Sequence, residues 1–128
     1  MNSINKVAVL GGGSFGTVLA NLAASNGYKV SLWVRDSEQA LRINSEGANT
    51  SYHPELKLSK NIIASDNLKE VLNNKSIIFI ATPSIVFEQI VIRVSDYIDE
   101  KPYLVSCTKG ILDDPFRPLS EVISSSLK

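Results

Sequence analysis

Short apolar runs alternate along this chain with stretches in which apolar residues recur at helical spacing. The runs are rich in β-branched residues and are bounded by turn-forming residues, a pattern typical of buried parallel strands. They predict five strands, over residues 6–10, 30–34, 61–64, 76–81 and 103–106. Strands that alternate with helices favour a parallel sheet covered on both faces. We therefore expect an α/β fold with a doubly wound, mainly parallel sheet in three αβα layers, and a strand order of 3-2-1-4-5.

The helices between these strands are indicated by apolar spacing and by capping residues. We expect the first helix to follow a glycine cluster and to end near Asn26-Gly27. Asp36-Ser37 is expected to cap a helix over 38–45, Ser65-Asp66 to cap the next one, and Thr82-Pro83 to begin a fourth. Pro118 is expected to open a last helix. The apolar positions that predict these helices are Phe15, Val18, Leu19, Leu22 and Ala23, then Leu68, Val71 and Leu72, then Val86, Phe87, Ile90, Val91 and Val94, and last Leu119, Val122 and Ile123.

Two segments do not fit a regular alternation. Residues 47–60 are polar and irregular, and a connection of this length in a compact domain is often functional. The sequence stops at Lys128 inside a helical pattern without a closing turn. We therefore expect residues 1–128 to be one domain of a longer protein.

Composition narrows the possible classes of function. The 128 residues suit a single domain, and 13 basic residues balance 13 acidic ones without any long basic run. This argues against a nucleic-acid partner, which requires clustered positive charge. No apolar stretch approaches the length of a membrane span. Residues 1–6 are too short and polar for a signal peptide, so we expect none there. The single cysteine, Cys107, fits a reducing, cytoplasmic setting.

A glycine-rich motif carries the main functional signal. Gly11, Gly13 and Gly16 form a G-x-G-x-x-G between a predicted strand and a predicted helix, as in Rossmann-type dinucleotide-binding domains. Gly11 would allow a sharp turn out of the strand. Gly13 would allow a pyrophosphate to approach the backbone, and Gly16 would allow the helix to pack closely on the strand. The helix N-terminus would then face the phosphates with its unpaired N–H groups.

Arg35 bears on the choice of cofactor. Sites that prefer NAD place an acidic residue after the second strand, roughly 20 residues beyond the glycines. Arg35 stands in that region and can pair with the 2′-phosphate of NADP, so NADP(H) is favoured and NAD(H) remains possible. Asp36 follows directly and is a second candidate for contact with a ribose.

Lys109 follows the fifth strand, where ligands of open α/β sheets bind. A lysine there can reach a phosphate or a carbonyl on the nicotinamide side. Other residues receive structural interpretations. His53 has no partner at metal-ligand spacing, so we expect no metal site; Cys107 is expected to pack, and Trp33 to lie in the core.

Several motifs taken together resemble one family. GGGSFGT, TVLANLAASNG, LWVRD, the YHP loop, ATPS and CTKGI occur in the order seen in bacterial NAD(P)-dependent glycerol-3-phosphate dehydrogenases. The resemblance covers essentially the whole chain. It implies reduction of dihydroxyacetone phosphate to sn-glycerol 3-phosphate, with Ser14, Phe15, Arg35 and Tyr52 as cofactor contacts. It also implies that Lys109 reaches both cofactor and substrate. Phe15 stands where tryptophan or tyrosine is common in the family.

The resemblance also implies that part of the active site lies elsewhere. The family's catalytic lysine and substrate-phosphate groups belong to a C-terminal helical domain beyond Lys128, so no catalytic residue is assigned within this chain, and any homodimer is expected to form through that domain. Two alternatives stay open: the cofactor domain of another NADP reductase, of the ketopantoate reductase or β-hydroxyacid dehydrogenase type, or a non-catalytic nucleotide-sensing module.

Overall fold

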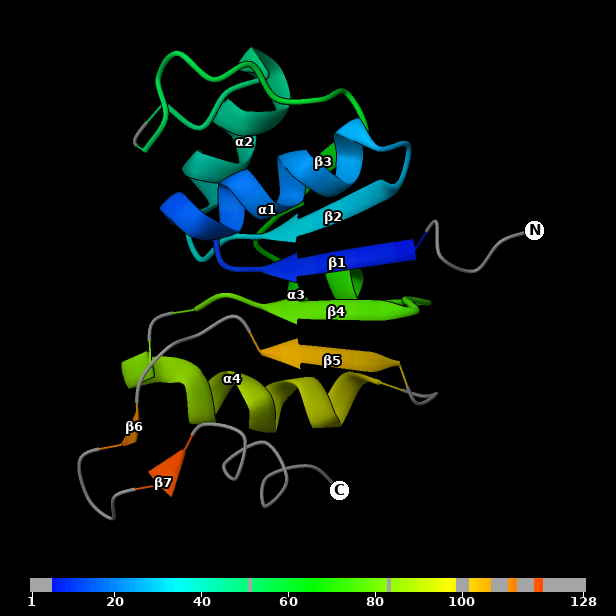
Figure 1. Ribbon diagram of the computed structural model, residues 1–128, viewed down its shortest axis with the longest axis vertical. Coiled ribbons are helices and arrows are strands. Elements are labelled where there is room, and N and C mark those ends of the chain that lie inside the picture. Colours follow the sequence, from blue (N-terminus) through cyan, green and yellow to red (C-terminus); the bar gives the residue numbers. More distant parts are fainter. Residues whose placement is uncertain are drawn as a thin grey trace.

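A five-stranded parallel sheet forms the centre of the molecule (Figure 1). The computed structural model describes residues 6–50, 52–82, 84–98, 102–106, 111–112 and 117–118. The strand order β3-β2-β1-β4-β5 confirms the predicted order. Each strand lies where a short apolar run predicted it: β1 (Lys6–Leu10), β2 (Lys29–Trp33), β3 (Ile62–Ser65), β4 (Ile77–Ile80) and β5 (Tyr103–Ser106).

Helices cover both faces of this sheet and complete the three predicted layers. They are α1 (Ser14–Ser25), α2 (Ser37–Glu46), α3 (Leu68–Leu72) and α4 (Ser84–Tyr97). One core contains residues of α1 and α2 packed on β1, β2 and β3. The other contains residues of α3 and α4 packed on β1, β4 and Trp33 at the end of β2. Alternate residues of β1 serve the two cores, with Val7 and Val9 on one side and Ala8 and Leu10 on the other.

Helix α1 packs on the sheet through small side chains. Its buried residues are Gly16, Thr17, Ala20 and Ala24. Its larger apolar residues Phe15, Val18 and Leu22 are 58%, 43% and 60% exposed. The helical spacing of these large residues therefore predicts the helix but not the face that it buries. Small residues on the buried face let the helix axis approach the sheet closely.

Capping residues begin two of the helices. Asp36 is the N-cap of α2 as predicted, and its carboxylate accepts a hydrogen bond from the Glu38 N–H at 3.0 Å. The N-cap of α3 is Asn67, so the predicted cap at Ser65-Asp66 is wrong by one residue. The Asn67 side chain accepts from the Glu70 N–H at 3.1 Å, while the Ser65 hydroxyl accepts from the Asn67 N–H at 3.0 Å. Ser65 thus supports the turn that precedes the cap.

The expectation for Pro118 is wrong. Pro118 ends a short strand, β7 (Arg117–Pro118), which pairs antiparallel with β6 (Ile111–Leu112). A proline opens a helix well, but it is also tolerated at the end of a short strand that has no further neighbour, where fewer ladder bonds depend on its N–H. Figure 1 places this ribbon beside α4. The helix predicted after Pro118, and Pro83 in the fourth helix, lie outside the described residues.

The irregular segment after α2 is held by hydrogen bonds although it has no regular element among its described residues. The Asn49 carbonyl accepts from the N–H groups of Tyr52 at 3.1 Å and His53 at 2.8 Å. The Leu58 N–H donates to the Gly47 carbonyl at 2.7 Å, and the Leu58 side chain is buried. The loop lies beside α1, since the Ser59 N–H donates to the Asn21 Oδ1 at 2.8 Å. No helix within the described part of the chain is long and apolar enough to cross a membrane.

Candidate dinucleotide-binding site

The glycine turn leaves β1 through a conformation that favours glycine. Gly11 has a φ of +123°, and a Cβ there would lie 2.7 Å from the carbonyl oxygen of Ala81. The Gly11 N–H donates to the Trp33 carbonyl at 2.9 Å. Both the backbone angle and the neighbouring backbone therefore exclude a larger residue at this position.

Gly16 packs the first turn of α1 against the glycine turn itself. A Cβ on Gly16 would overlap the carbonyl oxygen of Gly11 and lie 3.6 Å from the Cβ of Ala81. The helix can sit this close to β1 and β4 only because position 16 carries no side chain. This is the role that the motif predicts for its third glycine.

Gly13 differs from the other two glycines because it faces open space. Nothing lies within 4 Å of the place where its Cβ would be. Gly13 is the N-cap of α1 and provides no side-chain cap, and the first helical bond runs from the Thr17 N–H to the Gly13 carbonyl at 3.0 Å. The N–H groups of residues 14–16 precede that bond and have no partner within the helix. The open space and these N–H groups fit a pyrophosphate.

Buried polar side chains fix the back of the turn. Asn49 is 1% exposed, and its Nδ2 donates to the Gly12 carbonyl at 2.8 Å and to the Thr17 Oγ1 at 2.8 Å. Gln39 Nε2 donates to the same Gly12 carbonyl at 2.9 Å and to the Asn49 Oδ1 at 3.1 Å. The Thr17 hydroxyl donates to the Gly13 carbonyl at 2.7 Å. Sequence reasoning missed Gln39 and Asn49, because a single amide in a polar segment gives no local signal of burial.

The loop after α2 also reaches the N-terminus of α1. His53 Nε2 lies 3.1 Å from both the hydroxyl and the carbonyl oxygen of Ser14. Tyr52 precedes His53 and is 52% exposed, and Phe15 is exposed on the first turn of the helix. The structure therefore brings a histidine, which the sequence placed in no site, beside Ser14.

Arg35 lies at a separate cavity of about 290 Å³ beyond the carboxyl end of β2. Asp36, the other ribose candidate, is exposed but uses its carboxylate to cap α2. Trp33 is 3% exposed, as expected for a core residue, and its Nε1 donates to the Asp66 carbonyl at 3.0 Å. Seven residues line the cavity, namely Trp33, Arg35, Asp66, Val86, Gln89, Ile90 and Arg93.

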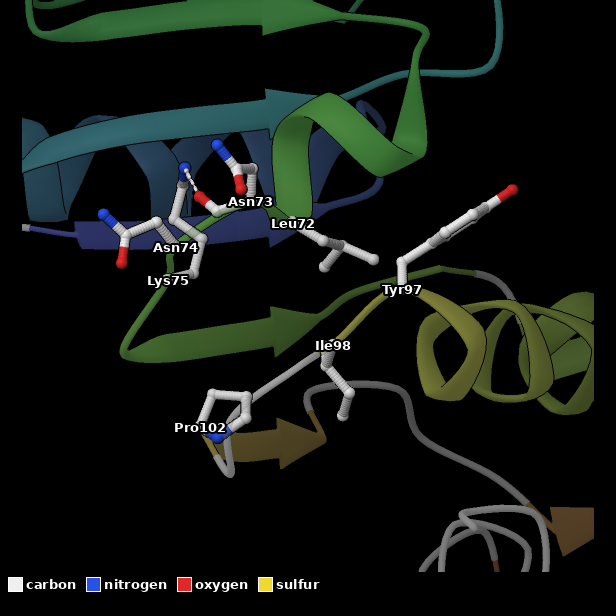
Figure 2. A pocket seen from close by; sticks show the side chains of 7 residues that line it. All are labelled: Leu72, Asn73, Asn74, Lys75, Tyr97, Ile98 and Pro102. Atoms are coloured by element: carbon white, nitrogen blue, oxygen red, sulfur yellow. Dashed lines mark hydrogen bonds between the residues drawn. The ribbon is translucent and has the colours of Figure 1, made fainter.

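A second cavity, of about 310 Å³, lies at the opposite ends of the strands (Figure 2). Its lining includes Asn74 and Lys75, which precede β4, so it faces the amino ends of the strands. Burial lowers the pKa of the Lys75 ammonium below 10.5, and the positive charge of Lys6 lowers it further. Ligands of open α/β sheets bind at the carboxyl ends, so this cavity is not the dinucleotide site.

Two further expectations concern Lys109 and metals. Lys109 lies outside the described residues, as does Cys107. Among the residues that the structure describes, no group of three or more His, Cys, Asp or Glu side chains could hold a metal ion.

Comparison with known proteins agrees with the geometry of the site. Residues 6–128 match the family model described as NAD-dependent glycerol-3-phosphate dehydrogenase N-terminus. A relative from Alcanivorax borkumensis, named glycerol-3-phosphate dehydrogenase [NAD(P)+], is 42% identical over 93% of this chain, and one of the same name from Acinetobacter baylyi is 40% identical over 95%. A crystal structure of glycerol-3-phosphate dehydrogenase from Coxiella burnetii superposes with a TM-score of 0.88 at 35% identity over 94% of this chain.

These matches concern the N-terminal part of longer proteins. The chain spans 35% and 34% of the two curated relatives and 37% of the Coxiella burnetii chain. The match over residues 6–128 favours this family over the ketopantoate reductase and β-hydroxyacid dehydrogenase alternatives. With a glycine turn shaped for a pyrophosphate and a family match over almost its whole length, the chain belongs to the NAD-dependent glycerol-3-phosphate dehydrogenase family, in its N-terminal part.

Proposed function

We propose that this chain is the cofactor-binding domain of an oxidoreductase that interconverts dihydroxyacetone phosphate and sn-glycerol 3-phosphate. The observation that carries the proposal is the open space at Gly13, in front of the free N–H groups of α1. The relatives support the substrate, since their names specify glycerol 3-phosphate and NAD(P)+.

Each candidate residue then has a part in holding the dinucleotide. Gly11 and Gly16 shape the turn, and Gly13 admits the pyrophosphate to the N–H groups of Ser14, Phe15 and Gly16. Phe15 and Tyr52 offer exposed aromatic surface near that end of the helix. The nicotinamide, when bound, supplies the hydride that reduces the carbonyl carbon.

Lys109 has a separate role in this proposal. It contacts both the nicotinamide side of the cofactor and the substrate, as the family resemblance implies. A protonated lysine there would stabilise the negative charge that develops on the substrate oxygen. The remaining substrate contacts, the catalytic lysine and any homodimer interface come from sequence that the longer relatives possess. We place the enzyme in the cytoplasm, where its phosphorylated substrate would also be available.

The test of the glycine turn is calorimetric. Gly13→Val should abolish binding of NADPH and NADH, because the new side chain occupies the space where the pyrophosphate would lie. The same variant should remain folded, since no neighbouring atom is displaced. Ser25→Val, at the other end of α1, is the matched control and should bind like the wild type. Unchanged binding by Gly13→Val would remove the turn from the site.

We further propose that Arg35 biases the site toward NADPH. A charge-assisted contact to the 2′-phosphate contributes about 1.5–3 kcal/mol, which corresponds to about ten- to hundredfold discrimination. Arg35→Asp should flatten or invert the ratio of the two dissociation constants, measured at one salt concentration. Equal affinity of the wild type for NADH and NADPH would contradict this assignment.

A further inference from the structure

The cavity beyond the end of β2 contains a second arginine, which comes from a distant part of the sequence. Arg93 lies on α4, and its guanidinium carbon is 5.7 Å from the centre of the Trp33 ring. Arg93 and Arg35 line the same cavity, so α4 and the turn that follows β2 each contribute one cation to it. Nothing in the local sequence around Arg93 connects it with Arg35, and only the packing of α4 across the sheet brings them to one place.

Trp33 holds Arg93 in a position from which it can still bind an anion. The Trp33 ring is almost fully buried, and its Nε1–H is used by the Asp66 carbonyl at 3.0 Å, so the orientation of the ring is fixed. A guanidinium over an indole ring is attracted by the ring's negative face. Such contact leaves the N–H donors at the edge of the guanidinium available to phosphate oxygens.

The chemistry of the lining indicates the kind of ligand. The lining contains two arginines and one acidic residue, Asp66, so its net charge is positive and the cavity favours an anion. Val86 and Ile90 add apolar surface from α4, and Gln89 adds an amide that can both donate and accept. A ligand with a phosphate beside a flat, weakly polar ring system matches this combination. The volume of about 290 Å³ is at the lower end of typical ligand sites, which suits part of a dinucleotide rather than all of it.

We propose that this cavity binds the adenosine 2′-phosphate portion of NADPH and that Arg93 is a second residue that determines preference for it. Arg35 and Arg93 approach the 2′-phosphate from different elements, and each can donate two hydrogen bonds to its oxygens. This inference rests on the proposed function, because it concerns the adenosine end of the same cofactor. It adds a contact from α4 to the contact from Arg35.

The test compares ligands with and without the 2′-phosphate. NADPH, NADH, adenosine 2′,5′-bisphosphate and ADP are titrated into the wild-type chain and into Arg93→Gln by calorimetry at fixed salt. Because Arg93→Gln removes one charge-assisted contact, it should lower the affinity for NADPH and for adenosine 2′,5′-bisphosphate about tenfold or more. The affinities for NADH and ADP should change less than about twofold, because these ligands lack the 2′-phosphate. Arg42→Gln is the control, because it removes one positive charge on α2, on the other face of the sheet. It should leave the affinities for all four ligands unchanged.

Two results would overturn the assignment. If Arg93→Gln weakens the binding of all four ligands equally, Arg93 supports Trp33 or the fold and does not contact the 2′-phosphate. Thermal melts of Arg93→Gln and Arg93→Lys identify loss of folding as a cause. If the affinity for every ligand is unchanged, Arg93 does not contact the cofactor. Failure of the proposed function is a separate outcome, because the wild type would then bind neither NADH nor NADPH. Adenosine 2′,5′-bisphosphate would still test the cavity in that case.

Discussion

Single amide side chains determine the shape of the glycine turn as much as the glycines do. Asn49 and Gln39 both donate to the Gly12 carbonyl, and Asn49 also donates to the hydroxyl of Thr17. These bonds join the loop after α2, the helix α2 itself and the first turn of α1. A backbone held in this way would need little further ordering to receive a phosphate group.

Removing the Asn49 amide should therefore weaken both the fold and the site. Asn49→Ala leaves the Gly12 carbonyl and the Thr17 hydroxyl with fewer partners, and a buried group that loses its bond costs about 1–3 kcal/mol. Urea denaturation should show this loss of stability, and NADPH binding should weaken in parallel. Asn26→Ala removes one exposed bond, to the Leu22 carbonyl, and should change stability much less. A variant at position 49 as stable as the wild type would show that the network contributes little.

Lys75 provides a prediction about pH. Its folded-state pKa is lowered by burial first and by Lys6 second, so the unfolded chain binds the proton more tightly. Stability should therefore rise with pH from the folded-state pKa of Lys75 up to 10.5. Lys75→Met should be more stable than the wild type at pH 8, and the difference should shrink as the pH approaches 10.5. Urea denaturation at several pH values tests this, and a constant difference would contradict it.

Lys6 gives a separate check on the cause of the Lys75 shift. Lys6→Gln removes the nearby positive charge and should raise the pKa of Lys75 toward its ordinary value. NMR titration of the Lys75 side chain measures this directly. The shift that remains in Lys6→Gln would report the contribution of burial.

At the level of the elements, the position of α1 depends on the absence of side chains where it meets the sheet. Gly16 contacts the Gly11 carbonyl, and Ala20 and Ala24 continue the same buried face. The large apolar side chains of α1 are directed elsewhere, with Phe15, Val18 and Leu22 exposed. The same helix thus brings its N-terminal N–H groups close to the ends of β1 and β4, where the phosphates would bind.

Two alanine substitutions separate packing from binding at this helix. Gly16→Ala should destabilise the protein by at least about 1–3 kcal/mol, because the new methyl group overlaps backbone and forces α1 away from the sheet. Gly13→Ala should change stability by about 1 kcal/mol or less, since its methyl group enters open space at a helix N-cap. Thermal melts of the two variants provide the measurement. Equal melting temperatures would contradict the packing role of Gly16.

At the scale of the whole molecule, the candidate cofactor contacts within the described residues gather at one end of the sheet. The glycine turn, the loop after α2 and the Arg35 cavity all lie at the carboxyl edge of one sheet. The relatives are about three times as long as this chain, which spans 35% of the first. Hydride transfer also needs a substrate held in near-attack geometry, and that positioning supplies about 7–11 kcal/mol in favourable cases.

The 128-residue chain by itself should therefore bind the dinucleotide without turning it over. NADPH oxidation with dihydroxyacetone phosphate, followed by absorbance, should stay at the level of the no-protein control. If this sequence is joined to the remaining length that its relatives possess, the resulting protein should be active, and Lys109→Ala in it should impair turnover. Sustained turnover by the chain alone would show that its own residues complete the site.

Much of this architecture could be predicted because its signals are local. The five strands follow from short apolar runs, the glycine motif follows from its spacing between a strand and a helix, and Asp36 is recognisable as a cap. Backbone sterics give each of these residue types a preference that does not depend on distant sequence. The local signal at Pro118 was ambiguous for the same reason, because proline is compatible with both a helix start and a strand end, and Pro118 ends β7.

Tertiary structure decided the features that depend on residues far apart in the chain. The buried face of α1, the burial of Asn49 beneath Gly12, the contact of His53 with Ser14 and the cavity that Arg35 and Arg93 both line all involve separate elements. The energy of such contacts depends on which side chains the sheet and helices bring within a few ångströms. By itself the sequence determined the sheet, its strand order and the glycine turn of a dinucleotide-binding domain. The packing of helices and loop on that sheet decided which polar side chains surround the turn.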